Sequence, residues 1–288
     1  MRRAWVALLL TLCACRPSAD RPIRIGSKNF SEQVLLGEIA AQGLEARGIR
    51  VDRRLNLGGT FICHQALKAG ELDLYPEYTG TAFTAILSRK PVSEPKLVFD
   101  EVRKEYLSRW KLVWSPPLGF ENTFALVMRG DDARRLAIRK ISDLATHPEI
   151  RPGFGYEFLE RADGFPGLAK AYGLAFRERP VQMDLGLLYQ ALESRKVDLV
   201  AGNSTDGLID AIGGVVLEDD RRYFPPYEAA FVVRGEIWNH PAVRGFLESL
   251  AGRIDAAAMR KMNAAVDKDK RRPEDVANEF LASQPRVK

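Results

Sequence analysis

Two stretches of similar sequence each end in a loop whose side chains could bind a small molecule. Residues 66–74 read ALKAGELDL and residues 191–199 read ALESRKVDL, so apolar residues and an aspartate recur in the same order without a gap. Each stretch predicts a helix end, a turn and a strand, followed by a loop that opens another helix. In this register Tyr78 and Asn203 are equivalent, and they offer an aromatic face and an amide group. The alternative is a chance similarity of two such units.

The ends of these strands indicate where a ligand would bind. If the repeat is real, both loops lie at the carboxyl ends of strands in paired lobes. Ligands of open α/β sheets bind at this edge, and clefts between domains are common binding sites. We therefore expect a ligand cleft between two lobes.

Residues suited to covalent or metal chemistry are scattered along the chain. The three histidines (His64, His147 and His240) pair no nucleophile with a base, and three cysteines support neither a disulfide framework nor a zinc cluster. The chain has no Gly-rich phosphate loop with a following Lys-Ser/Thr, so an ATPase would be a separate chain. The sequence predicts a binding module without metal or cofactor. The alternative is an enzyme that uses Tyr, Lys or Arg for acid–base chemistry.

The composition is that of a folded globular chain. Of the 288 residues, 46% are apolar and 28% are charged, which excludes disorder as the main state. The 43 basic and 38 acidic residues give a net charge of +5, and these charges are mixed along the chain. The sequence shows no compact basic stripe with interleaved aromatic residues, so we predict no nucleic-acid partner.

The first residues have the pattern of an export signal. Arg2 and Arg3 precede an apolar run that is too short to span a bilayer, so residues 1–14 are predicted to be a signal peptide. The sequence Leu-Cys-Ala before Cys15 resembles a bacterial lipobox, which predicts lipidation of Cys15 and a polar tether over residues 15–21. The body would then be soluble and anchored to the membrane, facing the periplasm or the cell exterior. The alternative is a plain secretory signal cleaved nearby.

The remaining chain alternates strand and helix patterns, which predicts an α/β fold with a mainly parallel sheet. Ser31 is placed to cap the first helix. Strands are predicted at 23–26, 51–55, 72–75, 123–128, 215–217 and 230–233, and helical segments at 31–47, 61–69 and 241–283.

Two Pro-Pro connectors divide this series. Pro116-Pro117 and Pro225-Pro226 each interrupt the alternation of strands and helices. Two such interruptions indicate two lobes joined by two crossings of the chain. Lobe one is predicted over residues 22–116 and 228–288, and lobe two over residues 117–227.

Five short motifs follow one another along the chain: IGSKNFSEQ at 25–33, NLGGT at 56–60, YPEYTGT at 75–81, NSTDG at 203–207 and YFPPY at 223–227. Together they resemble the substrate-binding proteins of ABC importers for osmoprotectants such as glycine betaine, choline, carnitine and related quaternary amines. The resemblance covers residues 23 to about 281. It implies a two-lobed periplasmic-binding-protein fold of type II with two hinge crossings, and a monomer that delivers a small zwitterion or quaternary amine to a membrane permease.

The resemblance also implies an aromatic cage around the ligand. A quaternary ammonium has no N–H donor, so aromatic faces hold it by cation–π attraction. The family's cage positions fall on Tyr78, Phe124, Asn203 and Tyr227. Asn203 stands where the family pattern has tyrosine, so the site either holds a quaternary amine less tightly or fits a ligand with a hydrogen-bonding group there. A structural alternative for Asn203 is a turn or helix cap.

Five further polar residues are candidates for the site. Lys28 and Arg161 are implied to bind an anionic tail, and Thr60 and Thr81 are expected to open helices with hydroxyls that cap or reach the ligand. Asn122 matches a polar family position.

Three alternatives stay open for this site. Glu160 or Asp163 could simply pair with Arg161. Tyr156 and Phe120 are secondary aromatic candidates for the ligand site. The ligand could be of a different class, namely an aromatic thione-betaine, a polyamine or an amino acid.

Overall fold

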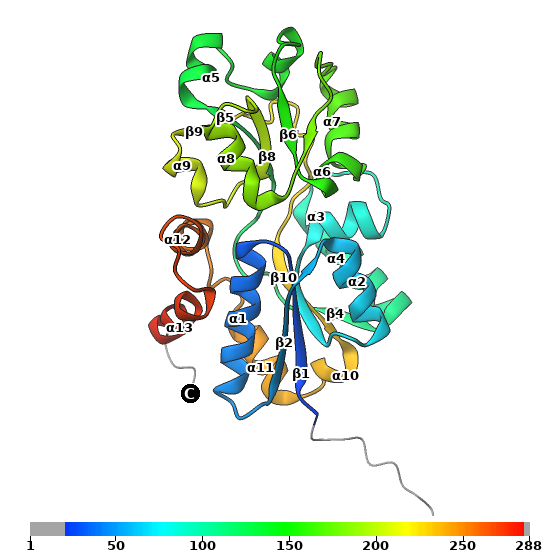
Figure 1. Cartoon of the computed structure of the whole chain (residues 1–288). Helices are drawn as coiled ribbons and strands as arrows, with labels where there is room; N and C mark the ends of the chain where they lie inside the picture. Colours follow the sequence, from blue (N-terminus) through cyan, green and yellow to red (C-terminus); the bar gives the residue numbers. More distant parts are fainter. Residues whose placement is uncertain (1–20, 285–288) are drawn as a thin grey trace, which may run out of the picture.

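The computed structural model describes residues 21–284 and has two lobes, one above the other in Figure 1. The expected signal peptide, the lipidation site Cys15 and the first part of the tether lie outside the described residues. In the described part, no helix is long and apolar enough to cross a membrane.

The lower lobe of Figure 1 is built on a five-stranded sheet in the order β2-β1-β3-β10-β4. Its strands are β1 (Ile23–Lys28), β2 (Val51–Gly58), β3 (Leu74–Tyr78), β4 (Leu112–Trp114) and β10 (Ala229–Arg234). β1 pairs in parallel with β2 and β3, whereas β10 runs antiparallel to β3 and β4.

The upper lobe has a sheet of the same design in the order β7-β6-β8-β5-β9. Its strands are β5 (Phe124–Arg129), β6 (Pro152–Phe154), β7 (Val181–Gln182), β8 (Leu199–Asn203) and β9 (Gly214–Val216). β6 pairs in parallel with β7 and β8, whereas β5 runs antiparallel to β8 and β9. The prediction of mainly parallel sheets holds for four of the five strands of each sheet, and one strand, β10 or β5, runs against the other four.

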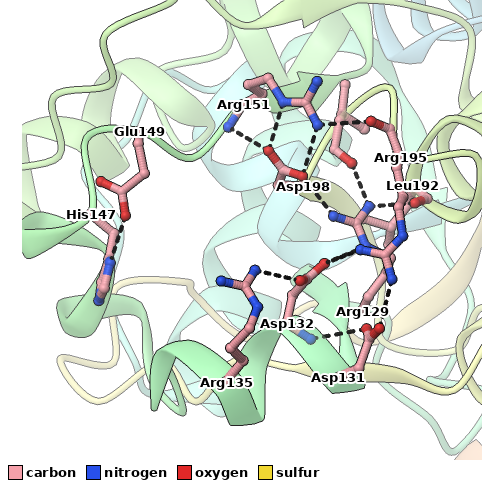
Figure 2. A network of polar contacts seen from close by, with 11 residues as sticks. Arg129, Asp131, Asp132, Arg135, His147, Glu149, Arg151, Leu192, Arg195 and Asp198 are labelled. Carbon is pink, nitrogen blue, oxygen red and sulfur yellow. Dashed lines mark hydrogen bonds and ion pairs between the residues drawn. The ribbon is translucent and has the colours of Figure 1, made fainter.

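The repeated aspartates occupy matching places in the two sheets. Asp73 accepts hydrogen bonds from the backbone N–H of Arg24 (2.9 Å) and from its guanidinium (3.1 Å). Asp198 accepts the equivalent pair from Arg151, at 3.3 Å from the backbone and 2.8 Å from the guanidinium (Figure 2). Each aspartate thus fastens its central strand to the parallel neighbour, so the recurrence in the sequence corresponds to one recurring structural unit.

Helices cover the sheet of the lower lobe on both faces. α1 (Ser31–Glu45) packs with α11 (Pro241–Ser249), α12 (Ala256–Asp267) and α13 (Pro273–Ser283), while α2 (Thr60–Ala69) and α4 (Pro95–Trp110) enclose a second apolar cluster. The short helices are α3 (Thr79–Thr81), which continues into a π-helical turn Ala82–Ile86, and α10 (Gly235–Trp238).

The helices of the upper lobe are shorter. They are α5 (Gly130–Leu136), α6 (Tyr156–Glu160), α7 (Phe165–Tyr172), α8 (Leu188–Glu193) and α9 (Leu208–Ala211), with 3-10 turns at Ile141–Thr146 and Leu185–Leu187. Two apolar clusters, one on each face of this sheet, form the core of the upper lobe.

The chain crosses between the lobes twice, after β4 and after β9, and the crossings run side by side. Asn122 N–H donates to Tyr227 O at 3.0 Å, and Ala229 N–H donates to Phe120 O at 3.1 Å. These bonds join the crossings into a short antiparallel pair, whose two strands form the hinge.

Two predicted helix starts are wrong. Ser31 is the first residue of α1 and not its cap, because Phe30 holds the extended conformation before the helix. The Ser31 hydroxyl donates to Asp267 instead of capping the helix. Thr81 is the last residue of α3, and Thr79 opens that helix. Thr60 opens α2 as expected, and Gly70, in the left-handed conformation, ends it.

Candidate functional site

A cavity of about 340 Å³ lies between the lobes, where the end of β3 meets the end of β8. Its wall takes residues from both lobes and from both crossings, which is the arrangement expected of a ligand cleft. The lining residues are Lys28, Asn29, Phe30, Gly58, Gly59, Ile62, Tyr78, Thr81, Asn122, Phe124, Tyr156, Glu157, Phe158, Arg161, Asp184, Leu185, Ala201, Asn203 and Tyr227.

The structure brings the predicted site residues together with one exception. All but Thr60 line the cavity, and Tyr156 does so with an exposed side chain. Thr60 lies behind this wall and bonds to two residues on it, Lys28 and Glu157. Phe120 is buried in the apolar core of the lower lobe and does not line the cavity, because its crossing turns the ring inward.

Aromatic rings form much of the wall. Phe124 and Tyr227 meet edge to face with centroids 6.0 Å apart, and Tyr78 stacks with Phe30 at 6.4 Å. Burial raises the pKa of Tyr78 and of Tyr227 well above the ordinary value of 10, so both phenols are neutral donors. The fourth cage position holds Asn203 in place of an aromatic ring, and Asn203 lies opposite Phe124 in the β5–β8 register.

Lys28 is a buried cation with a buried partner. Its ammonium donates to Glu77 Oε1 at 2.5 Å and to Thr60 Oγ1 at 3.3 Å. The same ammonium lies 4.8 Å from the centre of the Tyr78 ring. Its charge is therefore balanced inside the protein. Two rings of the expected cage already lie beside a cation of the chain itself, since Arg161 is 5.1 Å from the centre of the Phe124 ring.

Arg161 forms an ion pair with Asp163, one of the two acidic partners that the sequence offered. Its guanidinium donates to both carboxylate oxygens of Asp163, at 2.9 and 2.5 Å. Burial alone would raise the pKa of Asp163, but the charge and hydrogen bonds of Arg161 hold it below the ordinary value of 3.8. Tyr227 and Thr84 hydroxyls also donate to Asp163, at 2.7 and 2.6 Å. The buried pair therefore joins lobe two to the second crossing and to the helical segment after β3.

Glu157 of α6 connects the lobes at the start of α2. It accepts a hydrogen bond from the Thr60 backbone N–H at 2.5 Å and from the Thr60 hydroxyl at 3.1 Å. Helix N-termini attract anions, so this carboxylate occupies a place where an anionic group is favoured.

Glu32, in the first turn of α1, is a carboxylate near the site with four donors, each from a different residue. It accepts from Tyr78 Oη at 2.6 Å, Asn122 Nδ2 at 2.8 Å, Thr205 Oγ1 at 2.6 Å and Asn263 Nδ2 at 2.9 Å. Burial raises the pKa of Glu32 above 4.5, although these four bonds oppose the rise. Because Thr205 belongs to the upper lobe, Glu32 ties that lobe to α1, to β3 and to the first crossing.

Asp206 orients the amide of Asn203. It accepts from the Asn203 backbone N–H at 2.8 Å and from Asn203 Nδ2 at 3.3 Å, and from Tyr189 Oη at 2.5 Å. Burial raises the pKa of Asp206 to about 6, although hydrogen bonds from Tyr189 and Asn203 oppose the rise. A backbone turn follows Asn203, closed by the Asp206 N–H donating to Asn203 O at 3.0 Å. The Asn203 side chain donates to Asp206 instead of forming an Asx turn, and it lines the cavity.

Sequence reasoning missed Glu32, Glu77 and Glu157. Glu32 and Glu77 lie within two of the five motifs, but a single carboxylate at a helix start or in a strand gives no signal in the sequence that it is buried. Glu157 follows Tyr156 in a segment without any such motif.

Comparison with known proteins identifies the family. Residues 21–283 match the OpuAC family model, described as the substrate binding domain of an ABC-type glycine betaine transport system. The chain belongs to this family. It is an extracytoplasmic substrate-binding component of an ABC importer, and the relatives reported below are transport proteins rather than enzymes.

Individual relatives agree with this assignment. The chain is 38% identical over 265 residues to an ergothioneine transport permease/ergothioneine binding protein of Helicobacter pylori, covering 91% of this chain and 47% of that relative, so it spans about half of the relative's length. It is 37% identical over 271 residues to a glycine-betaine-binding protein of Pseudomonas aeruginosa, covering 90% and 86% of the two chains. A crystal structure of a glycine betaine/carnitine/choline ABC transporter protein superposes with a TM-score of 0.74 at 31% identity, covering 90% of this chain and 97% of the other.

Proposed function

We propose that this chain is a monomeric lipoprotein, anchored through Cys15, that captures a small betaine-type zwitterion in the aromatic-lined cleft between its lobes. It delivers the ligand to a membrane permease that works with a separate ATPase. Lobe one is formed by residues 22–116 and 228–288, and lobe two by residues 117–227. Closure over the ligand presents both lobes to the permease together.

The aromatic wall of the cavity carries this proposal. Tyr78, Phe124 and Tyr227 line one cavity, and faces of this kind attract an ammonium that has no N–H donor. Around the cavity, carboxylates outnumber cations. Lys28 and Arg161 are each neutralised by a buried acidic partner. Glu157, on the cavity wall, adds a further negative charge. This balance favours a ligand with a cationic end.

The start of α2 is a candidate binding site for the carboxylate of a zwitterionic ligand. Glu157 occupies the Thr60 N–H and lies 3.6 Å from Arg161. A ligand carboxylate that displaces Glu157 would gain the same helix N-terminus and the same guanidinium.

Calorimetry with a ligand panel tests the proposal. We expect the purified protein to bind at least one of glycine betaine, choline, carnitine and ergothioneine with a micromolar or lower Kd, because the cavity combines aromatic faces with carboxylates of the chain. Putrescine and the common amino acids serve as the comparison ligands. Binding of a polyamine or an amino acid with no response to any betaine would contradict the betaine assignment.

Ergothioneine, an aromatic thione-betaine, is a second candidate ligand. The Helicobacter pylori relative is named for it, and Asn203 replaces one ring of the cage with an amide that can hydrogen-bond. Within the panel, ergothioneine binding at least tenfold tighter than glycine betaine would favour this ligand.

The lipid anchor has its own test. Cells that express the protein are grown with labelled fatty acid, and the label is expected on the wild type and not on the Cys15→Ala variant, since only a cysteine at this position fits the lipobox. The Cys63→Ala variant is the control and should keep the label, because Cys63 is buried. Label on the Cys15→Ala protein would refute the anchor.

A further inference from the structure

Two amide oxygens on the cavity wall have no hydrogen-bond donor in the described part of the chain. One is the buried Oδ1 of Asn122, on the first crossing. The other is Oδ1 of Asn203, at the end of β8, whose side chain is only partly buried. A carbonyl oxygen accepts hydrogen bonds only, so the chemistry that satisfies these two atoms is an N–H or O–H group.

The orientation of the Asn122 amide follows from its partner. Asn122 Nδ2 donates to Glu32 Oε1 at 2.8 Å. Both carboxylate oxygens of Glu32 accept hydrogen bonds from side chains around them. Turning the amide round would place its oxygen against the carboxylate, so the NH2 group faces Glu32 and Oδ1 faces away. Asn122 is only 5% exposed, and Oδ1 is buried without a partner. An unpaired buried acceptor is costly, so it needs an explanation.

The Asn203 amide is oriented in the same way by a different carboxylate. Its Nδ2 and its backbone N–H both point to Asp206. Its Oδ1 therefore faces away from Asp206 and has no partner among residues 21–284.

The two amides flank one ring of the cavity. Asn203 is paired with Phe124 across the β5–β8 ladder, and Asn122 lies two residues before Phe124 on the same chain. Directly opposed residues of an antiparallel pair have Cβ atoms about 4.5–5.5 Å apart. A group held against Phe124 is thus within reach of both amides.

We propose, building on the function proposed above, that this site selects betaines that carry an N–H or O–H donor beside their quaternary ammonium. A hydroxyl group or the N–H of a heterocyclic ring supplies that donor. A fully methylated betaine without such a group leaves the buried Asn122 Oδ1 unpaired and forgoes a bond to Asn203 Oδ1, so it is bound more weakly. Sites built to hydrogen-bond a substrate reject analogues that lack the bonding group, because their own polar groups then stay unpaired.

The test compares ligands that differ in the donor. One arm measures by calorimetry the Kd of carnitine against 4-trimethylammoniobutanoate, which is carnitine without its hydroxyl group. The second arm measures ergothioneine against its derivative methylated on both ring nitrogens. We expect at least about tenfold tighter binding of the donor-bearing ligand in one arm, and the arm that responds identifies the donor as hydroxyl or ring N–H.

Variants connect this preference to the two amides. Asn203→Leu and Asn122→Leu keep the size of the side chain and remove its acceptor, so the ratio of the two Kd values is expected to fall to within about threefold in at least one of them. Asn239→Leu, on the exposed end of α10, is the control and should keep the wild-type ratio.

The outcomes separate this inference from the function on which it rests. Equal Kd values within both ligand pairs on the wild-type protein overturn donor selection and leave betaine binding in place. Donor selection that persists in both leucine variants overturns the role of these amides. No binding of any betaine overturns the proposed function and the inference with it.

Discussion

Replacing Asp163 with asparagine is expected to lower the free energy of unfolding by about 3–5 kcal/mol, since it removes one partner of a buried ion pair. The substitution keeps the shape of the side chain but removes the charge that balances Arg161, and both side chains are almost fully buried. Hydroxyls of Tyr227 and Thr84 also lose a charged acceptor. Chemical denaturation of the ligand-free protein at pH 7 measures the change.

The pH and a control variant sharpen this expectation. Because Arg161 holds the pKa of Asp163 below 3.8, the contribution of the ionised carboxylate is present above pH 3.8 and is lost as the pH falls through the lower, folded-state pKa. The control is Asp100→Asn, which removes the same charge from an exposed pair with Lys96 and should leave the denaturation midpoint unchanged. Equal effects of the two substitutions would show that the Asp163 pair is not a buried structural unit.

Replacing Glu32 with alanine is expected to weaken ligand binding at least tenfold. Hydrogen bonds to a charged group contribute about 1.5–3 kcal/mol each, and the bond from Thr205 holds the upper lobe to α1. Without it the closed form is less populated, and the apparent affinity falls with the fraction of binding-competent protein. Calorimetry with the tightest ligand of the panel measures this loss, and small-angle scattering with and without ligand reports closure.

Glu38→Ala is the matched control for this experiment. Glu38 is also a buried carboxylate of α1, but its partners Arg53 and Gln42 lie in the lower lobe. We expect the control to lower stability and to leave the ligand Kd within about threefold of the wild type, because it breaks no bond between the lobes. If both variants lose the same affinity, Glu32 acts through the stability of α1 and not through closure.

Much of the fold follows from local patterns. The repeated strand–turn unit predicted the equivalence of Tyr78 and Asn203, and each is the last residue of the central strand in its sheet. The boundaries were less accurate, since β3 was predicted at residues 72–75 and is found at Leu74–Tyr78. Pro76 in that strand reads as a break in the sequence, yet it pairs with Phe231 of β10 within the ladder.

The antiparallel strands could not be read from local pattern. β5 and β10 look like any other apolar strand, but each is the first strand that the chain enters after crossing between lobes. Their direction is set by the hinge, in which the two crossings bond to one another. Strand direction is a property of the path of the chain in space, so periodicity does not predict it.

The sequence alone determined the α/β class, the family and most of the residues around the cavity, because motifs and periodicity are local and are carried by residue types. Only the tertiary structure decided how the charges are balanced. Lys28 and Arg161 were expected to receive an anion, and each is instead paired with a buried carboxylate, because an isolated charge is too costly to bury. The donors to Glu32 are 46 to 231 positions away along the chain, so no local pattern could assign it a role before the lobes were folded together.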